Sequence, residues 1–210
     1  MRAVQPAGVI LTGGRSSRMG VVHKALLEVQ GQPLLQYVID KLQPHVAPLL
    51  LSCQNGADEF DRFGLNRVPD LVSNFNGPLT GLYSALQYVS DRGLDNGLVL
   101  VPCDAPFMPE NLVQTLVDAA TGDVKPVVVV SCQGVLQPTF SLWQVHHLPV
   151  IRKAVAGQGR EGLKHMLASL PHTIVEWPAA EPSPFFNVNT PADLRAAAVF
   201  IERFAGNATE

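Results

Sequence analysis

Residues 8–20 read GVILTGGRSSRMG, and Lys24 follows four positions later. The opening GVIL is apolar without alternation and leads toward a glycine pair, a pattern typical of a short buried strand. Gly13 and Gly14 have no Cβ, so their backbone can adopt positive φ and present free N–H groups to an anion. Arg18 and Lys24 add positive charge beside these groups. The stretch therefore predicts a strand that leads into a triphosphate-binding loop.

This loop differs from two common phosphate-binding motifs. A Walker A loop requires G-x-x-x-x-G-K-[ST], but Gly14 and Gly20 are too far apart and Val21 follows. The Rossmann fingerprint G-x-G-x-x-G is also absent. An exposed turn is the alternative for two glycines alone, but clustered cations after a buried strand favour phosphate binding.

Apolar strands alternate with helices along the rest of the chain. This pattern favours an α/β fold of three layers, with a mainly parallel central sheet and helices on both faces. Strands are expected at residues 8–11, 25–29, 46–53, 65–68, 97–102, 127–132, 135–143, 173–176 and 185–188. Helices are expected at residues 34–42, 58–63, 79–89, 109–120, 148–155, 162–170 and 191–204. In such sheets ligands bind at the carboxyl ends of the strands, so the loops there are the places to seek chemistry.

The composition describes a globular protein. Of its 210 residues, 47% are hydrophobic and 16% are charged, which fits one domain with a substantial core. We expect a single domain over residues 1–210, with a nucleotide-binding part near 7–125 and an acceptor part near 126–190. The net charge of −3 does not favour binding to nucleic acid. No apolar stretch approaches the roughly 20 residues that cross a bilayer, and the N-terminus lacks a signal-peptide core, so we expect a cytoplasmic protein.

Asp104 ends the most apolar strand, within the sequence VPCDAP at residues 101–106. Pro102 and Pro106 restrict the backbone on either side, so the turn is stiff. A carboxylate held rigidly at a strand end suits Mg²⁺, which binds one or two carboxylates together with substrate phosphates. We therefore predict that Asp104 is a metal ligand. The alternative is an aspartate that caps the following helix.

A second polar motif lies near the C-terminus, where residues 187–191 read NVNTP. Alternate residues of a strand point to one side, so a strand here would put Asn187 and Asn189 on the same face. Their amides could complete the metal shell or hold phosphates. The alternative for Asn189 is that it only helps to start the last helix.

A third group of residues suggests a base pocket. Asp70 lies at a strand end, and its carboxylate could accept hydrogen bonds from guanine N1–H and N2–H or bind ribose hydroxyls. Gly77 and Gly81, in the sequence GPLTG, would permit close approach of a flat base. The alternative for Asp70 is a turn-forming aspartate after a proline.

These motifs together resemble those of the GT-A-like nucleotidyltransferases, and most of all the molybdenum cofactor guanylyltransferases. The resemblance rests on L-x-G-G-x-S-x-R-M-G with Lys24, and on P-x-D-x-P, G-P-L-x-G and N-V-N-T-P. It extends over residues 8–195. It implies an enzyme that transfers GMP from GTP to molybdopterin or Mo-molybdopterin, releases pyrophosphate and uses Mg²⁺. It also implies a monomer that makes transient contacts with other molybdenum cofactor proteins.

The resemblance also assigns roles to residues. The residues expected to be catalytic are Lys24, Arg18 and Asp104, of which Asp104 is the metal ligand. The residues expected to bind the nucleotide and metal are Leu11, Thr12, Gly13, Gly14, Lys24, Ser52, Asp70, Gly77, Gly81, Asp104, Asn187 and Asn189.

Three positions depart from the family pattern. Thr12 replaces a small apolar residue, His23 stands where the family has Asp before the lysine, and Ser52 stands where Asn is common. These changes leave open a molybdopterin cytidylyltransferase or a sugar-phosphate nucleotidyltransferase. A non-catalytic nucleotide-binding relative is a second alternative, but the presence of Lys24 and Asp104 argues against it.

Overall fold

The protein was studied as a computed structural model. The structure describes residues 5–13, 23–54, 56–72, 77–122, 126–157 and 162–207.

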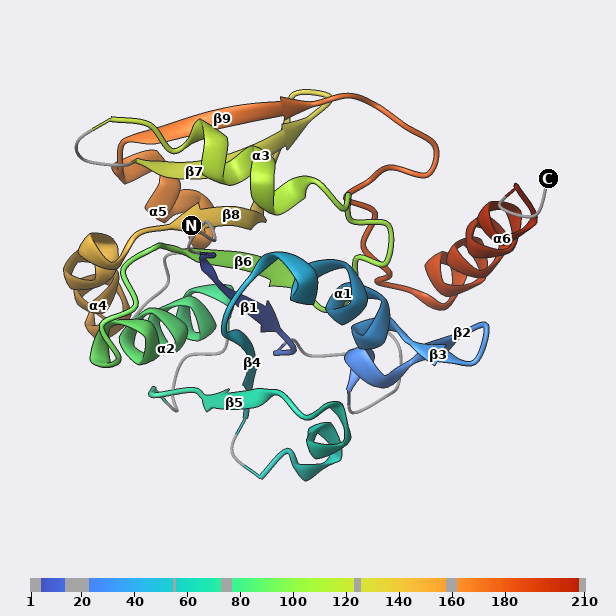
Figure 1. Cartoon of the computed structure of the whole chain (residues 1–210), viewed down its shortest axis with the longest axis horizontal. Helices are drawn as coiled ribbons and strands as arrows, with labels where there is room; N and C mark the ends of the chain where they lie inside the picture. Colours follow the sequence, from blue (N-terminus) through green and yellow to red (C-terminus); the bar gives the residue numbers. More distant parts are fainter. Residues whose placement is uncertain are drawn as a thin grey trace.

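A seven-stranded sheet forms the centre of the molecule (Figure 1). In chain order its strands are β1 (Ala7–Leu11), β4 (Leu49–Cys53), β5 (Asn66–Pro69), β6 (Leu98–Pro102), β7 (Val127–Cys132), β8 (Val135–Trp143) and β9 (His172–Trp177). Their spatial order is β5-β4-β1-β6-β8-β7-β9, and β8 runs antiparallel to both of its neighbours. The other neighbouring pairs are parallel, which confirms the mainly parallel sheet.

Helices cover both faces of this sheet. The α-helices are α1 (Leu34–Leu42), α2 (Pro78–Asp91), α3 (Leu112–Ala119), α4 (Leu148–Ala156), α5 (Leu163–Ser169) and α6 (Pro191–Asn207). The 3₁₀ turns are η1 (Lys24–Leu26), η2 (Gln43–His45), η3 (Asp58–Phe63) and η4 (Val145–His147). In β1, Ile10 packs in the core shared with α1 and α3, whereas Val9 packs in the core shared with α2, α4 and α5. This alternation confirms the three layers.

The parallel strands bring their carboxyl ends to one edge of the sheet. Leu11 is in register with Ser52 of β4 on one side and with Pro102 of β6 on the other. The Thr12 N–H donates to the Ser52 carbonyl at 3.0 Å, and the Cys103 N–H donates to the Leu11 carbonyl at 3.1 Å. The segments that leave β1, β4 and β6 therefore start side by side.

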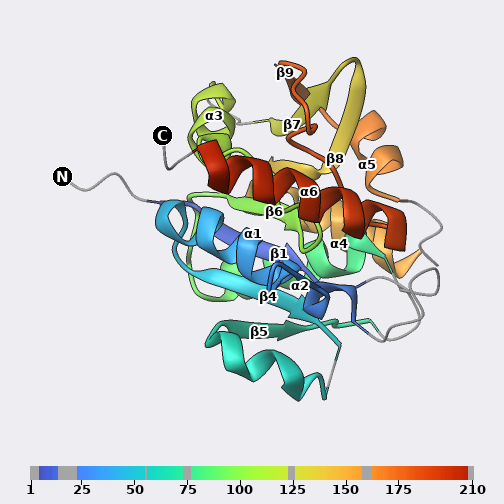
Figure 2. The same ribbon diagram turned by 90° about the vertical axis from the view of Figure 1, so that its right-hand side faces the viewer.

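The last helix lies across this carboxyl edge (Figure 2). A third apolar cluster joins α6 to the small hairpin formed by β2 (Glu28–Val29) and β3 (Gln32–Pro33), through Ala197 and Val29. Val188, which precedes α6, is buried in the same cluster. Across the described ranges no helix is long and apolar enough to cross a membrane.

Three sequence expectations about elements were wrong. Residues 25–29 form the turn η1 followed by β2, because Ala25 is buried and the hairpin to β3 takes up the chain after it. The helix expected at 109–120 begins only at Leu112, after a turn. Residues 185–188 form no strand: Phe185 and Val188 are buried by packing, without strand pairing.

Candidate active site

The site centres on the side chain of Lys24. Its ammonium donates to the Asp104 carboxylate, and it also donates to Asn189 Oδ1 at 2.6 Å. The Lys24 and Asp104 side chains are only 17% and 13% exposed. Three motifs that lie far apart in the sequence, after β1, after β6 and before α6, therefore meet at one nitrogen.

Asp104 is held by the turn that follows β6. Ala105 and Pro106 are buried, and the Asp104 carbonyl accepts a hydrogen bond of 2.9 Å from the Val188 N–H. This backbone contact brings the segment before α6 against the turn. Since α3 begins only at Leu112, with Asn111 as its N-cap residue, Asp104 does not cap that helix. The alternative of a capping aspartate is thus excluded.

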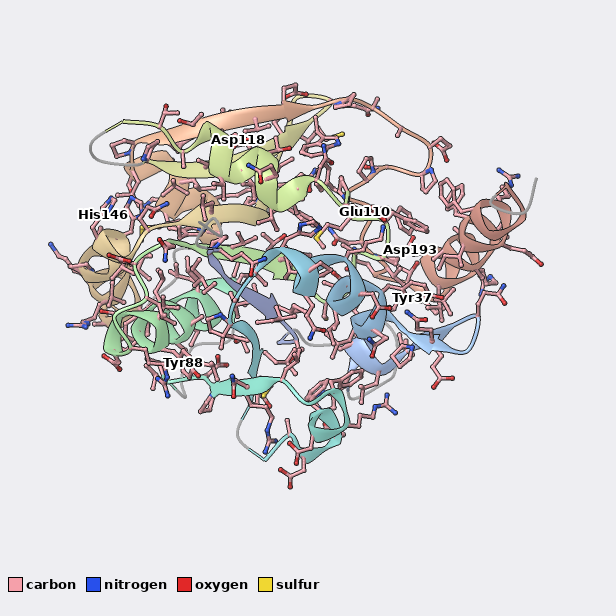
Figure 3. The ribbon with its side chains drawn as sticks, viewed as in Figure 1. Tyr37, Tyr88, Glu110, Asp118, His146 and Asp193 are labelled. Atoms are coloured by element: carbon pink, nitrogen blue, oxygen red, sulfur yellow. The ribbon has the colours of Figure 1, made fainter. Side chains whose placement is uncertain are left out.

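Asn189 is positioned by the first turn of α6. One oxygen of Asp193, at the start of this helix (Figure 3), accepts the N–H groups of Asn189 at 2.9 Å and Thr190 at 2.8 Å. The Asp193 N–H donates in turn to Thr190 Oγ1 at 3.2 Å, which completes a capping box. Burial alone would raise the pKa of Asp193, but the hydrogen bonds to its carboxylate outweigh burial and lower that pKa. Since the capping box starts the helix, the Asn189 side chain remains directed at Lys24.

Asn187 lies in the same loop, with its backbone carbonyl 3.3 Å from Asn189 Nδ2. Its own Oδ1 is buried and has no hydrogen-bond partner in the described part of the chain. The prediction that a strand places the Asn187 and Asn189 amides on one face was wrong, because these residues lie in an irregular loop. An unsatisfied buried oxygen is costly, and a ligand that it could bind would remove the cost.

The oxygens of Asp104 and Asn189 at the Lys24 ammonium suit a hard divalent cation, because Mg²⁺ prefers oxygen ligands. Asn187, in the same loop as Asn189, has a further amide oxygen that is buried without a partner among the described residues. The Lys24 ammonium already contacts the Asp104 and Asn189 oxygens. Within the described ranges no group of three or more His, Cys, Asp or Glu residues could hold a metal. A single carboxylate completed by substrate phosphates is the pattern that Mg²⁺ uses most often at phosphate-transfer sites.

A second cluster forms beside the end of β1. Thr12 Oγ1 donates to the Ser52 carbonyl at 2.7 Å, and Asp70 follows β5 on the far side of β4. Burial raises the pKa of Asp70, while a hydrogen bond with Ser52 acts in the opposite direction. The Leu71 N–H donates to Ser84 Oγ on α2 at 3.0 Å, which ties the segment after β5 to that helix. The predicted base-pocket residues at the ends of β1, β4 and β5 are thus brought together.

Gly77 and Gly81, the two glycines of the predicted base pocket, have different roles in the structure. A Cβ on Gly81 would lie 2.6 Å from both Leu11 Cδ2 and Ser52 Oγ, so this glycine lets α2 pack closely against the sheet. Gly77 precedes α2 in an extended conformation as its N-cap residue. The sequence predicted that Gly81 lets the nucleotide base approach closely. In the structure the Leu11 and Ser52 side chains occupy the space beside this glycine.

The phosphate loop is described only at its first glycine. Gly14 and Arg18 lie outside the described residues. Gly13 is exposed and does not use positive φ, and a Cβ there would meet no atom of the described residues within 4 Å. Its backbone is therefore open to a ligand without the left-handed conformation that the sequence allowed.

Sequence reasoning missed one contact of this site. His23, noted only as a departure from the family pattern, pairs with Glu59 on η3. No spacing rule links two residues 36 positions apart. A separate cavity of about 600 Å³ lies between α3, the end of β9 and α6, and none of the predicted site residues lines it.

Comparisons with known proteins identify the family to which the chain is similar. The family model described as a MobA-like NTP transferase domain matches residues 8–174. A molybdenum cofactor guanylyltransferase of Rhodopseudomonas palustris (strain BisB5) is 35% identical over 190 residues, covering 90% of each chain. One of Rhizobium meliloti (strain 1021) is 35% identical over 205 residues, covering 95% of this chain and 93% of that protein.

Solved structures share the fold at lower identity. Molybdopterin-guanine dinucleotide biosynthesis protein A from Archaeoglobus fulgidus superposes with a TM-score of 0.74 at 21% identity, covering 94% of this chain and 99% of that chain. Rv0371C of Mycobacterium tuberculosis, solved in complex with manganese, superposes with a TM-score of 0.64 at 19% identity, covering 92% and 97%.

The parallel sheet, the glycine loop after its first strand and the match to the family model define a nucleotidyltransferase. The chain belongs to the family of MobA-like NTP transferase domains, and its curated relatives are named molybdenum cofactor guanylyltransferases.

Proposed function

We propose that this enzyme transfers GMP from GTP to molybdopterin or Mo-molybdopterin. A terminal phosphate oxygen of the pterin attacks the α-phosphorus of GTP, the bond from that phosphorus to the bridging oxygen breaks, and pyrophosphate leaves. The names of the curated relatives support the substrates. The observation that carries the proposal is the contact of Lys24 with Asp104 and Asn189, because it joins the phosphate loop to the other two motifs.

The roles of the residues follow from the chemistry of phosphoryl transfer. The attacking phosphate is already ionised at neutral pH, so the reaction needs positioning and charge neutralisation more than a protein base. The N–H groups of Gly13 and Gly14, together with Arg18, would hold the triphosphate. Lys24, a compact charge, would approach the α-phosphoryl group.

A divalent cation is part of the proposal. Asp104, Asn189 and Asn187 would hold it, and we propose Mg²⁺ as the physiological ion; the manganese complex of the mycobacterial neighbour supports a divalent ion in this fold. Such an ion would neutralise charge on the triphosphate. Since Lys24 contacts the Asp104 and Asn189 oxygens, its ammonium and the cation would compete for these two groups in the nucleotide-free protein.

The choice of base is assigned to the cluster at the ends of β1, β4 and β5. Asp70 is proposed to bind guanine N1–H and N2–H, with Thr12, Ser52 and the end of Leu11 forming the surrounding surface. The departures at Thr12 and Ser52 keep CTP as the alternative nucleotide. A comparison of GTP and CTP turnover with the same pterin decides between the two.

The remaining properties are proposals that accompany the activity. We propose one domain over residues 1–210 that acts as a monomer in the cytoplasm, with transient contacts to other molybdenum cofactor proteins. Residues 7–125 would bind the nucleotide and residues 126–190 the acceptor.

Asp104→Ala tests the assignment of the metal ligand. Without this carboxylate we expect pyrophosphate release with Mg²⁺ to fall by about 100-fold or more, because charge on the triphosphate is no longer neutralised. Turnover is measured as pyrophosphate released with GTP and molybdopterin, and the fold is checked by circular dichroism.

The matched control is Asp118→Ala, which removes an exposed carboxylate from the outer side of α3 (Figure 3). This variant should keep full turnover. GMP transfer by Asp104→Ala at near the wild-type rate would show that the metal assignment is wrong.

A further inference from the structure

We propose that His23 and Glu59 form a positioning pair that fixes where Lys24 presents its ammonium; the inference rests on the proposed function. His23 Nε2 lies 2.5 Å from Glu59 Oε1, with the two side chains 25% and 36% exposed. The His23 ring also meets the buried Phe60 ring edge-on, with centroids 5.3 Å apart. Two contacts of different kind therefore attach the residue before Lys24 to η3.

The turn η3 is a firm support for this attachment. Phe60 is only 1% exposed and belongs to the core beneath α1 and α3. Arg67 on β5 pairs with Asp58 and with Asp61 of the same turn, each at 3.1 Å. A carboxylate that leaves this turn, such as that of Glu59, is therefore presented from a fixed backbone.

The attachment acts directly on the lysine. The His23 carbonyl accepts the Leu26 N–H at 3.2 Å and so begins η1, while Ala25 is fully buried. Lys24 stands between these two fixed points. A shift of the His23 backbone would move the origin of the long Lys24 side chain, and a misplacement of about 1 Å far from the reacting atoms can cost about 100-fold in rate.

The charges explain why histidine occupies this position. A carboxylate at position 23 would face Glu59 and repel it, whereas the His23 Nε2–H donates a hydrogen bond to the Glu59 carboxylate. The carboxylate that contacts residue 23 comes from Glu59 on η3. Because exposed ion pairs add little to stability, we assign the pair to positioning and not to holding the fold together.

Four variants test the proposal by turnover with GTP and molybdopterin. His23→Asp should lower kcat by about 10-fold or more at a nearly unchanged KM for GTP, because Lys24 is displaced. His23→Gln, whose amide Nε2 can still donate to Glu59, should stay within about threefold of wild type. His23→Asp combined with Glu59→Lys restores an attractive pair and should recover most of the lost kcat. The control Arg62→Gln removes an exposed charge from the same turn without touching His23, Glu59 or the Arg67 pairs, and should not change kcat.

A second readout needs neither substrate. In the nucleotide-free protein Lys24 competes with a cation for Asp104, so His23→Leu should bind Mn²⁺ about threefold more tightly than wild type by titration calorimetry. The Tm of each variant should remain within about 2–4 °C of wild type, which separates positioning from a general loss of structure.

The outcomes are distinguishable. Wild-type kcat in His23→Asp, or wild-type Mn²⁺ affinity in His23→Leu, would overturn the positioning role. Absence of pyrophosphate release by the wild-type enzyme itself would contradict the proposed function, while the Mn²⁺ titration would still decide the role of His23.

Discussion

At the scale of single residues, the proposed chemistry depends on the contacts of the Lys24 ammonium with Asp104 and Asn189. The sequence motifs identified Lys24, Asp104 and Asn189 as separate candidates, because each stands in a recognisable local pattern. Their mutual contact could not be read from those patterns, since it depends on how β1, β6 and α6 are placed in space. The buried, unpartnered oxygen of Asn187 and the pair of His23 with Glu59 were likewise beyond sequence reasoning.

Gly81 is the residue at which close packing is most directly testable. In Gly81→Ala the new Cβ would meet Leu11 Cδ2 and Ser52 Oγ at 2.6 Å, so these side chains must rotate away or α2 must shift. We expect a loss of about 1–3 kcal/mol in the free energy of unfolding, as is typical for overpacking. We also expect a higher KM for GTP, because Ser52 is part of the predicted base pocket. Urea denaturation and steady-state kinetics measure the two effects.

Gly162→Ala is the control for this substitution. Gly162 has an ordinary negative φ of −79°, and a Cβ there would meet no atom within 4 Å in the part of the chain that the structure describes. Equal stabilities of the two variants would show that the contact of α2 with β1 and β4 is looser than described.

At the scale of secondary-structure elements, the sequence predicted the sheet better than the loops. The long apolar runs of β1, β4, β6 and β7 were correctly predicted to be strands. Strand β8 has the expected bounds, Val135–Trp143. Short apolar runs carry less information. In residues 185–188, Phe185 and Val188 are buried by individual contacts, such as the edge-on contact of Phe185 with Phe140. Their apolar pattern in the sequence is the same as that of a short strand.

The start of α6 is the element whose effect on the site can be measured. Asp193→Ala removes the acceptor for the N–H groups of Asn189 and Thr190. At pH 7 we expect a loss of about 1 kcal/mol in stability, the usual value of an N-terminal cap. Turnover should fall as well, because Asn189 is no longer held against Lys24. Thermal unfolding and pyrophosphate release measure the two effects.

The stability difference should depend on pH in a defined direction. The pKa of Asp193 is lowered in the folded protein, so its contribution is present above the ordinary aspartate pKa of about 4 and is lost as pH falls through the lowered value. The gap in Tm between wild type and Asp193→Ala should therefore narrow below about pH 4. A gap that stays constant down to pH 2 would mean that the carboxylate does not stabilise the helix start.

At the scale of the whole molecule, the sheet passes without interruption from the proposed nucleotide part to the proposed acceptor part. Strand β6 pairs with β8, and the core beneath α1 and α3 contains Ile10 as well as Val128 and Phe140. A shared core of this kind favours cooperative unfolding of both parts as one unit.

Nucleotide binding should therefore raise the single unfolding temperature of the entire chain. At 100 times its Kd a ligand adds about 2.7 kcal/mol, which corresponds to a rise in Tm of about 5–10 °C for a chain of this size. We expect Mg²⁺ with GTP to give this rise and Mg²⁺ with CTP or ATP to give less, measured by differential scanning fluorimetry.

The same nucleotides with excess EDTA serve as the control and should stabilise the protein less. A larger rise with CTP than with GTP would assign the base pocket to cytosine. Two separated transitions would contradict the single domain.

The ammonium seated between Asp104 and Asn189 has a consequence for how the enzyme rests between turnovers. If these oxygens hold the proposed divalent cation, the partly buried Asp104 carboxylate would need another positive partner whenever that cation is absent. The Lys24 ammonium provides that partner, so we expect removal of the cation by a chelator to stop turnover without destabilising the fold. If the proposed metal role is right, the protein would remain folded without a cation and regain activity when the nucleotide binds together with one.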